Sequence, residues 1–134
     1  GAVPQLEFRR IGLEPFCVLG AEALPVRLQH GPRFEVLGFR FGDVAYCTDV
    51  NAIPLESMER LRDLDVLVLD CLRREPHATH FGLEEALDIV QQLRPRRTLL
   101  THASHDLGYA ETNAALPPGV EMAYDGLEVP IAGL

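Results

Sequence analysis

The pattern of hydrophobic and polar residues changes about one third of the way along the chain. Before that point, short runs rich in β-branched and aromatic residues are separated by glycine and proline, a pattern typical of strands. The runs predicted as strands are residues 15–20, 24–31 and 34–42. The first third of the chain is therefore expected to be β-rich.

From residue 44 onward, apolar runs alternate with segments that have helical spacing. Strands are predicted at residues 44–50, 65–71 and 97–102, and helices at 54–64, 82–95 and 110–116. Pro54 suits the first residue of the first helix, and Pro95 ends the second. Asp125 and Gly126 predict the turn of a terminal hairpin over residues 120–131. The resulting order, βαβαβαββ after a β-rich start, indicates an α/β fold.

Composition narrows the classes of function. The 134 residues carry a formal net charge of −8, which argues against a broad binding surface for nucleic acid or anionic lipid. No apolar run is long enough to span a membrane, and no signal peptide is recognisable, so no membrane partner is expected. Cys17, Cys47 and Cys71 are widely spaced and form no CxxC motif. They predict reduced thiols in a cytoplasmic protein.

Four strands end in side chains that can bind a metal. His30, Asp49, Asp70 and His102 each stand at or near the end of an apolar run. In open α/β sheets, ligands bind outside the carboxyl ends of the strands, so these four side chains could converge on one site. Taken singly, each has a simpler interpretation, because such a histidine is usually hydrogen-bonded in a core or loop and such an aspartate often caps the next turn. The repetition of the pattern favours a shared site.

A second group of histidines precedes the helix predicted at 82–95. His80 is followed by Phe81 and Leu83, which anchor the backbone beside it. An imidazole titrates near neutral pH, so His80 is a candidate to donate a proton to a leaving oxygen. His77 follows Pro76 and is expected to be exposed. The alternative is a solvent-exposed loop with incidental histidines.

Four segments together resemble the second half of metallo-β-lactamase-fold hydrolases. They are "HG" at 30–31, "YCTDVNAIP" at 46–54, "LDVLVLDCLRREPHATHFGLEEAL" at 64–87 and "LLTHASHDL" at 99–107. The resemblance runs from about residue 24 to 131 and is strongest to the subgroup that includes phosphoribosyl 1,2-cyclic phosphate phosphodiesterase. It implies an αββα sandwich with a two-metal site at one edge of the sheets.

The resemblance also implies roles for individual residues. His30 resembles a ligand of the first metal, Asp49 the carboxylate that bridges both metals, and His102 a ligand of the second. His80 resembles the histidine that protonates the leaving group, and His105 is expected to contact substrate phosphate. Asp70 is expected to hydrogen-bond to a metal ligand. Imidazole and carboxylate suit two divalent ions, with zinc or manganese favoured.

One family motif is not found in the sequence. Such hydrolases carry HxHxDH in an N-terminal half, which supplies further metal ligands, and these 134 residues contain no HxHxDH. We therefore expect residues 1–134 to form one C-terminal portion of a metallo-β-lactamase-like domain. Alone, the chain is expected to bind metal weakly or not at all and to be inactive. Its expected partners are the missing half, or a second copy that packs on the uncovered face of the sheet, and a small phosphodiester substrate.

Three functional interpretations stay open on the sequence. The first is part of a metal-dependent phosphodiesterase that acts on a cyclic phosphate or another small phosphodiester through metal-activated water. The second is a non-catalytic binding or regulatory module of the same fold. The third is a structural α/β domain whose histidines only support the fold.

Overall fold

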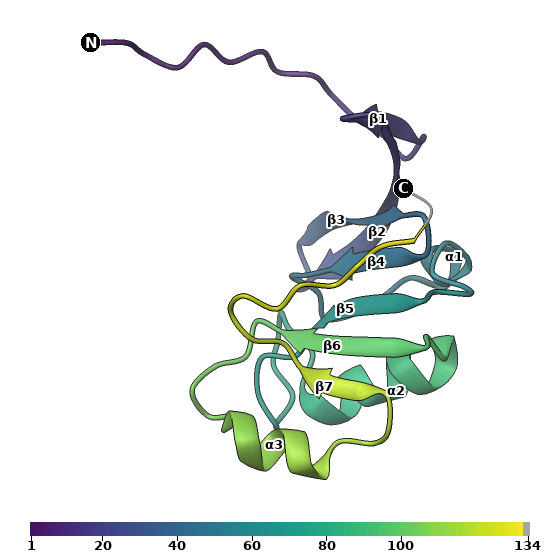
Figure 1. The fold of residues 1–134 in the computed structure, drawn as a ribbon, viewed down its shortest axis with the longest axis vertical. Helices are drawn as coiled ribbons and strands as arrows, with labels where there is room; N and C mark the ends of the chain where they lie inside the picture. Colours follow the sequence, from purple (N-terminus) through teal and green to yellow (C-terminus); the bar gives the residue numbers. More distant parts are fainter. Residues whose placement is uncertain (133–134) are drawn as a thin grey trace.

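A single mixed sheet organises the molecule. The computed structural model describes residues 1–132 and contains seven strands whose order in the sheet is the same as their order in the chain (Figure 1). The strands are β1 (Phe16–Val18), β2 (Ala21–His30), β3 (Phe34–Phe41), β4 (Val44–Cys47), β5 (Val66–Asp70), β6 (Arg97–Thr101) and β7 (Val120–Met122). The helices are α1 (Leu55–Glu59), α2 (Leu83–Leu93) and α3 (Tyr109–Ala115).

Strand direction changes in the middle of the sheet. Strands β1 to β4 are antiparallel neighbours, whereas β4 to β7 are parallel. Both β2 and β4 are antiparallel to β3, so they run in the same direction. The carboxyl ends of β2, β4, β5 and β6 therefore point toward one edge of the sheet. This topology explains why residues far apart in the sequence meet there.

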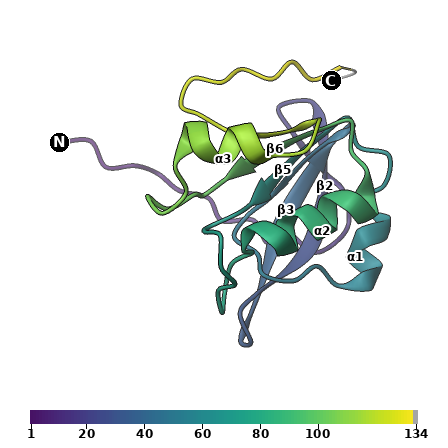
Figure 2. The same cartoon turned by 90° about the horizontal axis from the view of Figure 1, so that it is seen from below.

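The core lies between the sheet and two helices. Helices α1 and α2 lie on one face of the sheet, and the segment after β7 crosses the opposite face (Figures 1 and 2). Leu67 and Leu69 of β5, Leu100 of β6 and Ala86 of α2 are fully buried in one apolar cluster. Alternate residues of β5 thus face α2, as the strand periodicity requires.

The α/β order predicted from residue 44 is confirmed, and the predicted terminal hairpin is wrong. Val120 and Met122 of β7 are buried and pair in parallel with β6. The chain does turn near residues 125–126, where the amide of Leu127 donates to the carbonyl of Tyr124 at 3.1 Å. Within residues 1–132, however, no strand follows β7. The local turn signal was correct, but the pairing partner of β7 is the distant strand β6.

Several predicted elements are shorter than expected. The helix predicted at 54–64 begins at Leu55 and ends at Glu59, and the chain then turns through Asp63, which has a φ of 56°. The strand predicted at 44–50 ends at Cys47. Helix α2 ends at Leu93, because Arg94 adopts the left-handed conformation that commonly closes a helix.

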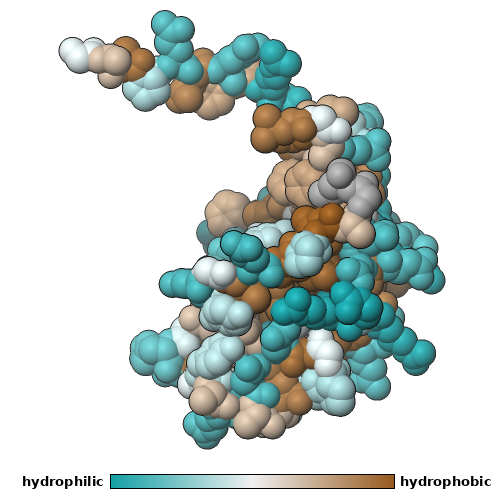
Figure 3. Space-filling view, viewed as in Figure 1, coloured by the Kyte–Doolittle hydropathy of each residue, from teal (hydrophilic) through white to brown (hydrophobic). Residues whose placement is uncertain are grey.

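The N-terminal segment extends away from the sheet (Figure 1). Residues 1–13 contain no helix or strand, and Val3 and Phe8 are 80% and 90% exposed. Hydrophobic and hydrophilic residues alternate along the surface of this segment (Figure 3). Among residues 1–132, no helix is long and apolar enough to cross a bilayer.

Candidate metal and catalytic site

The edge formed by the carboxyl ends of β2, β4, β5 and β6 carries a cluster of imidazoles and carboxylates. The cluster consists of His30, Asp49, Asp70, His80 and His102. Two groups of three within it place their nitrogen and oxygen ligand atoms within 4.8 Å of one another. One group is His30, Asp49 and His80, and the other is Asp70, His80 and His102.

Asp49 lies between two histidines. Its Oδ2 is 3.9 Å from Nε2 of His30, and its Oδ1 is 3.3 Å from Nε2 of His102. The hydroxyl of Thr48 donates to Oδ1 at 2.8 Å. Each carboxylate oxygen of Asp49 therefore faces a different imidazole.

His30 is oriented by a backbone contact with the loop between β5 and α2. Its Nδ1 is 2.7 Å from the carbonyl oxygen of Thr79. Because a carbonyl can only accept, the proton is assigned to Nδ1, which leaves the lone pair of Nε2 toward Asp49. The close approach needs the glycine that follows His30: a Cβ on Gly31 would lie 2.9 Å from Cγ2 of Thr79, and the φ of Gly31 is +78°.

His80 is held by a buried carboxylate. Its Nδ1 lies 2.7 Å from Oδ2 of Asp70, which also accepts the amide of Val50 at 2.8 Å. Asp70 is fully buried, and its other oxygen, Oδ1, has no hydrogen-bond partner among the described residues. This arrangement fixes the ring of His80 and leaves its Nε2 available for proton transfer.

His80 also lies against the two metal-binding histidine candidates. Its ring stacks on His102 with centroids 4.7 Å apart, and it meets the edge of His30 at 4.9 Å. His102 itself has a φ of 64°, a left-handed conformation that costs a residue with a Cβ about 1 kcal/mol or more. In this conformation the imidazole of His102 contacts Asp49 and stacks on His80.

The structure does not bring every predicted site residue into the cluster. The side chain of His105 is 96% exposed, and its Nε2 lies 3.4 Å from Asp106. Asp70 was expected to hydrogen-bond to a metal ligand, and its partner is His80, which belongs to both of the groups that could hold a metal ion. His77 was expected to be exposed, which is wrong, because it is half-buried with its ring centroid 5.4 Å from that of His80.

Sequence reasoning also missed the two contacts that organise the loop. The carbonyl of Thr79 orients His30, and the buried oxygen of Asp70 orients His80. A backbone carbonyl leaves no mark in the side-chain sequence. The "LD" at the end of a buried strand was the available signal for Asp70.

The buried cysteines offer no reactive thiolate. Burial raises the pKa of Cys47 to about 12, and burial next to Asp70 raises that of Cys71 to about 12. Both thiols are therefore protonated near neutral pH and are poor nucleophiles. Cys17 is exposed and lies in β1, outside the cluster.

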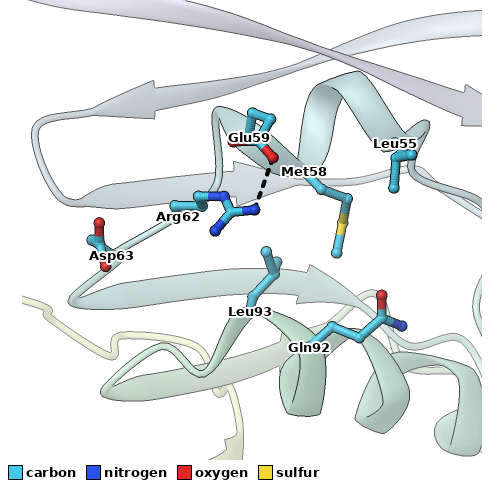
Figure 4. Close-up of a pocket in the computed structure, with 7 residues that line it drawn as sticks. All are labelled: Leu55, Met58, Glu59, Arg62, Asp63, Gln92 and Leu93. Carbon is cyan, nitrogen blue, oxygen red and sulfur yellow. Dashed lines mark hydrogen bonds and ion pairs between the residues drawn. The ribbon is translucent and has the colours of Figure 1, made fainter.

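Two surface pockets differ in their relation to the cluster. A recess of about 310 Å³ borders His102 and has Ala103 and Tyr124 in its walls. The second pocket, of about 300 Å³, lies between α1 and α2, where Glu59 and Arg62 form an ion pair at 2.8 Å (Figure 4). None of the residues that line the second pocket belongs to the cluster, so of these two pockets only the recess beside His102 borders it.

Residues 7–103 match the family model for the beta-lactamase superfamily domain. This chain belongs to the beta-lactamase superfamily. The fold of the family, a mixed α/β fold, agrees with the seven-stranded sheet and its helices. The predicted family and fold class are thus confirmed.

Solved structures and a curated relative extend the comparison. A diphosphatase from the PhnP family is 45% identical with a TM-score of 0.92, over 95% of this chain and 50% of that one. The short form of human tRNase Z is 19% identical with a TM-score of 0.66, over 87% of this chain and 45% of that one. An octanoyltransferase from Porphyromonas gingivalis (strain ATCC BAA-308 / W83) is 35% identical over 116 residues, which are 85% of this chain and 23% of that protein. This chain therefore spans half or less of each of these relatives.

Proposed function

We propose that these residues form part of a two-metal site in a hydrolase that cleaves a phosphorus–oxygen bond in a small phosphodiester or diphosphate. One observation carries the proposal. The two oxygens of Asp49 face the Nε2 atoms of two different histidines, His30 and His102. A carboxylate placed in this way suits a bridge between two ions, with one histidine on each.

The donor set fits divalent metals. His30 keeps its lone pair on Nε2, and Asp49 supplies a carboxylate at the same edge of the sheet. Neutral imidazole with carboxylate is a common ligand set for zinc, manganese and iron. Bound divalent ions would supply Lewis-acid activation of water and of the phosphoryl oxygens.

His80 is assigned the transfer of a proton to the leaving oxygen. Asp70 accepts from Nδ1, so the ring cannot rotate freely and Nε2 stays at the cluster. Because Asp70 is buried and also holds the amide of Val50, its position depends on the core rather than on solvent. A general acid at a fixed distance from the leaving group contributes about 10²–10⁴-fold to rate.

The class of substrate is supported by the relative with 45% identity, which is named a diphosphatase. Because that chain is about twice as long as the matched region, the activity proposed here is that of the complete protein. The remaining metal ligands would come from residues outside these 134.

The test measures metal and activity together in the complete protein. Elemental analysis after dialysis is compared with turnover of bis(4-nitrophenyl) phosphate and of an alkyl diphosphate before and after EDTA treatment and re-addition of manganese or zinc. Asp49→Ala is expected to lose both bound metal and turnover. The matched control is Asp88→Ala, since Asp88 is exposed on α2. Metal-independent turnover, or full metal content in Asp49→Ala, would overturn the proposal.

A further inference from the structure

His77 is a histidine beside the cluster with no part in the proposed metal site. Its ring centroid is 5.4 Å from that of His80. It belongs to neither of the two groups that could hold a metal ion. Its role must therefore come from its own hydrogen-bonding groups.

The proton of His77 can be assigned from its contacts. The backbone amide of Thr79 donates to Nδ1 of His77 at 3.2 Å, and the Thr79 hydroxyl lies at the same distance from that atom. An amide can only donate, so Nδ1 is the acceptor and the ring proton is assigned to Nε2. His77 thus presents one N–H donor, in a tautomer opposite to that of His30, whose Nδ1 faces the carbonyl of the same Thr79.

This donor is held in place and has no acceptor of its own. The guanidinium of Arg73 donates to the carbonyl of Pro76 at 2.7 Å, which fixes the backbone just before His77. Among residues 1–132, the hydrogen bonds of His77 involve only Nδ1, and Nε2 is not one of the buried side-chain atoms that lack a partner, so it is open to solvent. A solvent-accessible donor that is held next to a proposed proton donor is suited to an acceptor that arrives with the substrate.

We propose that His77 is a substrate-binding residue whose Nε2–H donates to an anionic oxygen of the phosphate ester. The inference rests on the proposed function, because it takes the substrate class from there. The chain carries a net charge of −8, so its overall electrostatic potential does not attract an anionic phosphate. Local hydrogen-bond donors must therefore hold such a substrate. Arg73 adds a fixed positive charge to the same loop.

Two isosteric variants separate substrate binding from support of the loop. In His77→Asn the side-chain oxygen can replace Nδ1 as acceptor for Thr79, but the donor at the Nε2 position is lost. In His77→Gln the longer amide can replace the Nε2 donor, while the acceptor near Thr79 is lost. His77→Ala removes both groups.

The experiment uses the complete protein with bis(4-nitrophenyl) phosphate as substrate and inorganic phosphate as a binding probe in calorimetry. His77→Asn and His77→Ala are expected to raise KM and the phosphate Kd by about tenfold or more, the effect of one hydrogen bond to a charged group. His77→Gln should retain more of the affinity, and metal content should stay at the wild-type level in all three variants.

Each other outcome overturns the inference in a recognisable way. Wild-type affinity in His77→Asn means that His77 only supports Thr79. Wild-type affinity in all three variants means that it has no role in binding. If the wild-type protein neither hydrolyses phosphate esters nor binds phosphate, the proposed function itself is wrong. If the wild-type protein turns over substrate and the His77 variants are unaffected, the proposed function holds and only the role of His77 is wrong.

Discussion

The imidazoles of the site take their roles from the single atoms that they contact. The carbonyl of Thr79 holds the proton of His30 on Nδ1, and the amide of the same residue holds the proton of His77 on Nε2. The carboxylate of Asp70 holds His80. Three equivalent side chains thus become a ligand candidate, a substrate-binding candidate and a proton-transfer candidate.

Removal of His80 should slow chemistry without loss of metal. In the complete protein, His80→Ala is expected to lower turnover of a phosphodiester with a poor leaving group by about 10²–10⁴-fold, since the leaving alkoxide no longer receives a proton. A nitrophenyl ester should be less affected because its leaving group needs less protonation. Steady-state kinetics with both substrates and elemental analysis check this. Equal losses on both substrates would assign the protonation step to another group.

The buried thiols should make stability depend on alkaline pH. An unfolded cysteine has a pKa near 8.5, whereas burial raises that of Cys47 to about 12. The contribution of the protonated thiol to folding is therefore complete below about pH 8.5 and is lost as pH rises toward 12, by about 1.4 kcal/mol per pH unit within that window.

Urea unfolding of wild type and Cys47→Ala at pH 8 and pH 10.5 measures this effect. The difference in the free energy of unfolding between the two proteins is expected to shrink at the higher pH. Cys17→Ala is the control, because Cys17 is exposed. A difference that stays constant with pH would show that Cys47 ionises normally in the fold.

At the scale of elements, backbone hydrogen bonds hold the loop between β5 and α2, which carries part of the site. The amide of Leu72 donates to the carbonyl of Phe81 at 3.0 Å, and the amide of Phe81 donates to the carbonyl of Val50 at 2.9 Å. Gly82 is buried where α2 begins. The two ends of the loop that carries His77, Thr79 and His80 are therefore joined by a backbone hydrogen bond.

Gly82→Ala should force the two ends of this loop apart. A Cβ at Gly82 would lie 2.7 Å from the backbone oxygen of Glu75, which cannot move aside as a side chain could. We expect a loss of about 1–3 kcal/mol in the free energy of unfolding. In the complete protein, turnover should also fall, because His80 shifts away from the cluster.

Chemical denaturation and kinetics check this variant against Gly12→Ala. The Cβ at Gly12 would meet only the flexible end of Glu14 at 3.0 Å, so this control should stay within about 0.5 kcal/mol of wild type. Unchanged stability and turnover in Gly82→Ala would show that the loop does not need this close approach.

The whole molecule presents apolar surface that its own helices leave uncovered. Helices α1 and α2 cover one face of the sheet, and the other is crossed by the segment after β7 (Figure 2). Tyr46 in the middle of β4 is 51% exposed, and Val3 and Phe8 project on the N-terminal segment. Apolar patches larger than a few hundred Å² are uncommon on soluble monomers, and they mark interaction sites.

We therefore predict that the 134-residue chain does not persist as a simple monomer. It should pair with the rest of the complete protein or associate with a second copy through the face that carries Tyr46. Sedimentation velocity at several concentrations tests this. A compact monomer with a sharp, cooperative unfolding transition at low micromolar concentration would show that these residues close their own core.

The 134-residue chain alone is expected to hold little metal. His30, Asp49 and His102 leave the coordination shell of two ions incomplete, so we expect at most one weakly held divalent ion that dialysis removes. Elemental analysis after dialysis measures it. Two tightly held equivalents per chain would mean that the described cluster is sufficient without further ligands.

The sequence by itself determined the order of elements from residue 44 to β7 and placed candidate site residues at or just after strand ends. Apolar runs and helical spacing have a period that depends on the chain alone, so the α/β order and the positions of His30, Asp49 and His102 could be predicted. The terminal hairpin could not be excluded, because Asp125 and Gly126 encode a turn but not the partner strand. Only the tertiary structure decided that β7 pairs with β6, that Asp70 bonds to His80, and that His77 lies beside the cluster. The pairing of β7 with β6 joins segments that an intervening helix separates, and the contacts of Asp70 and His77 depend on the conformation of the loop between β5 and α2, which leaves no periodic pattern in the sequence.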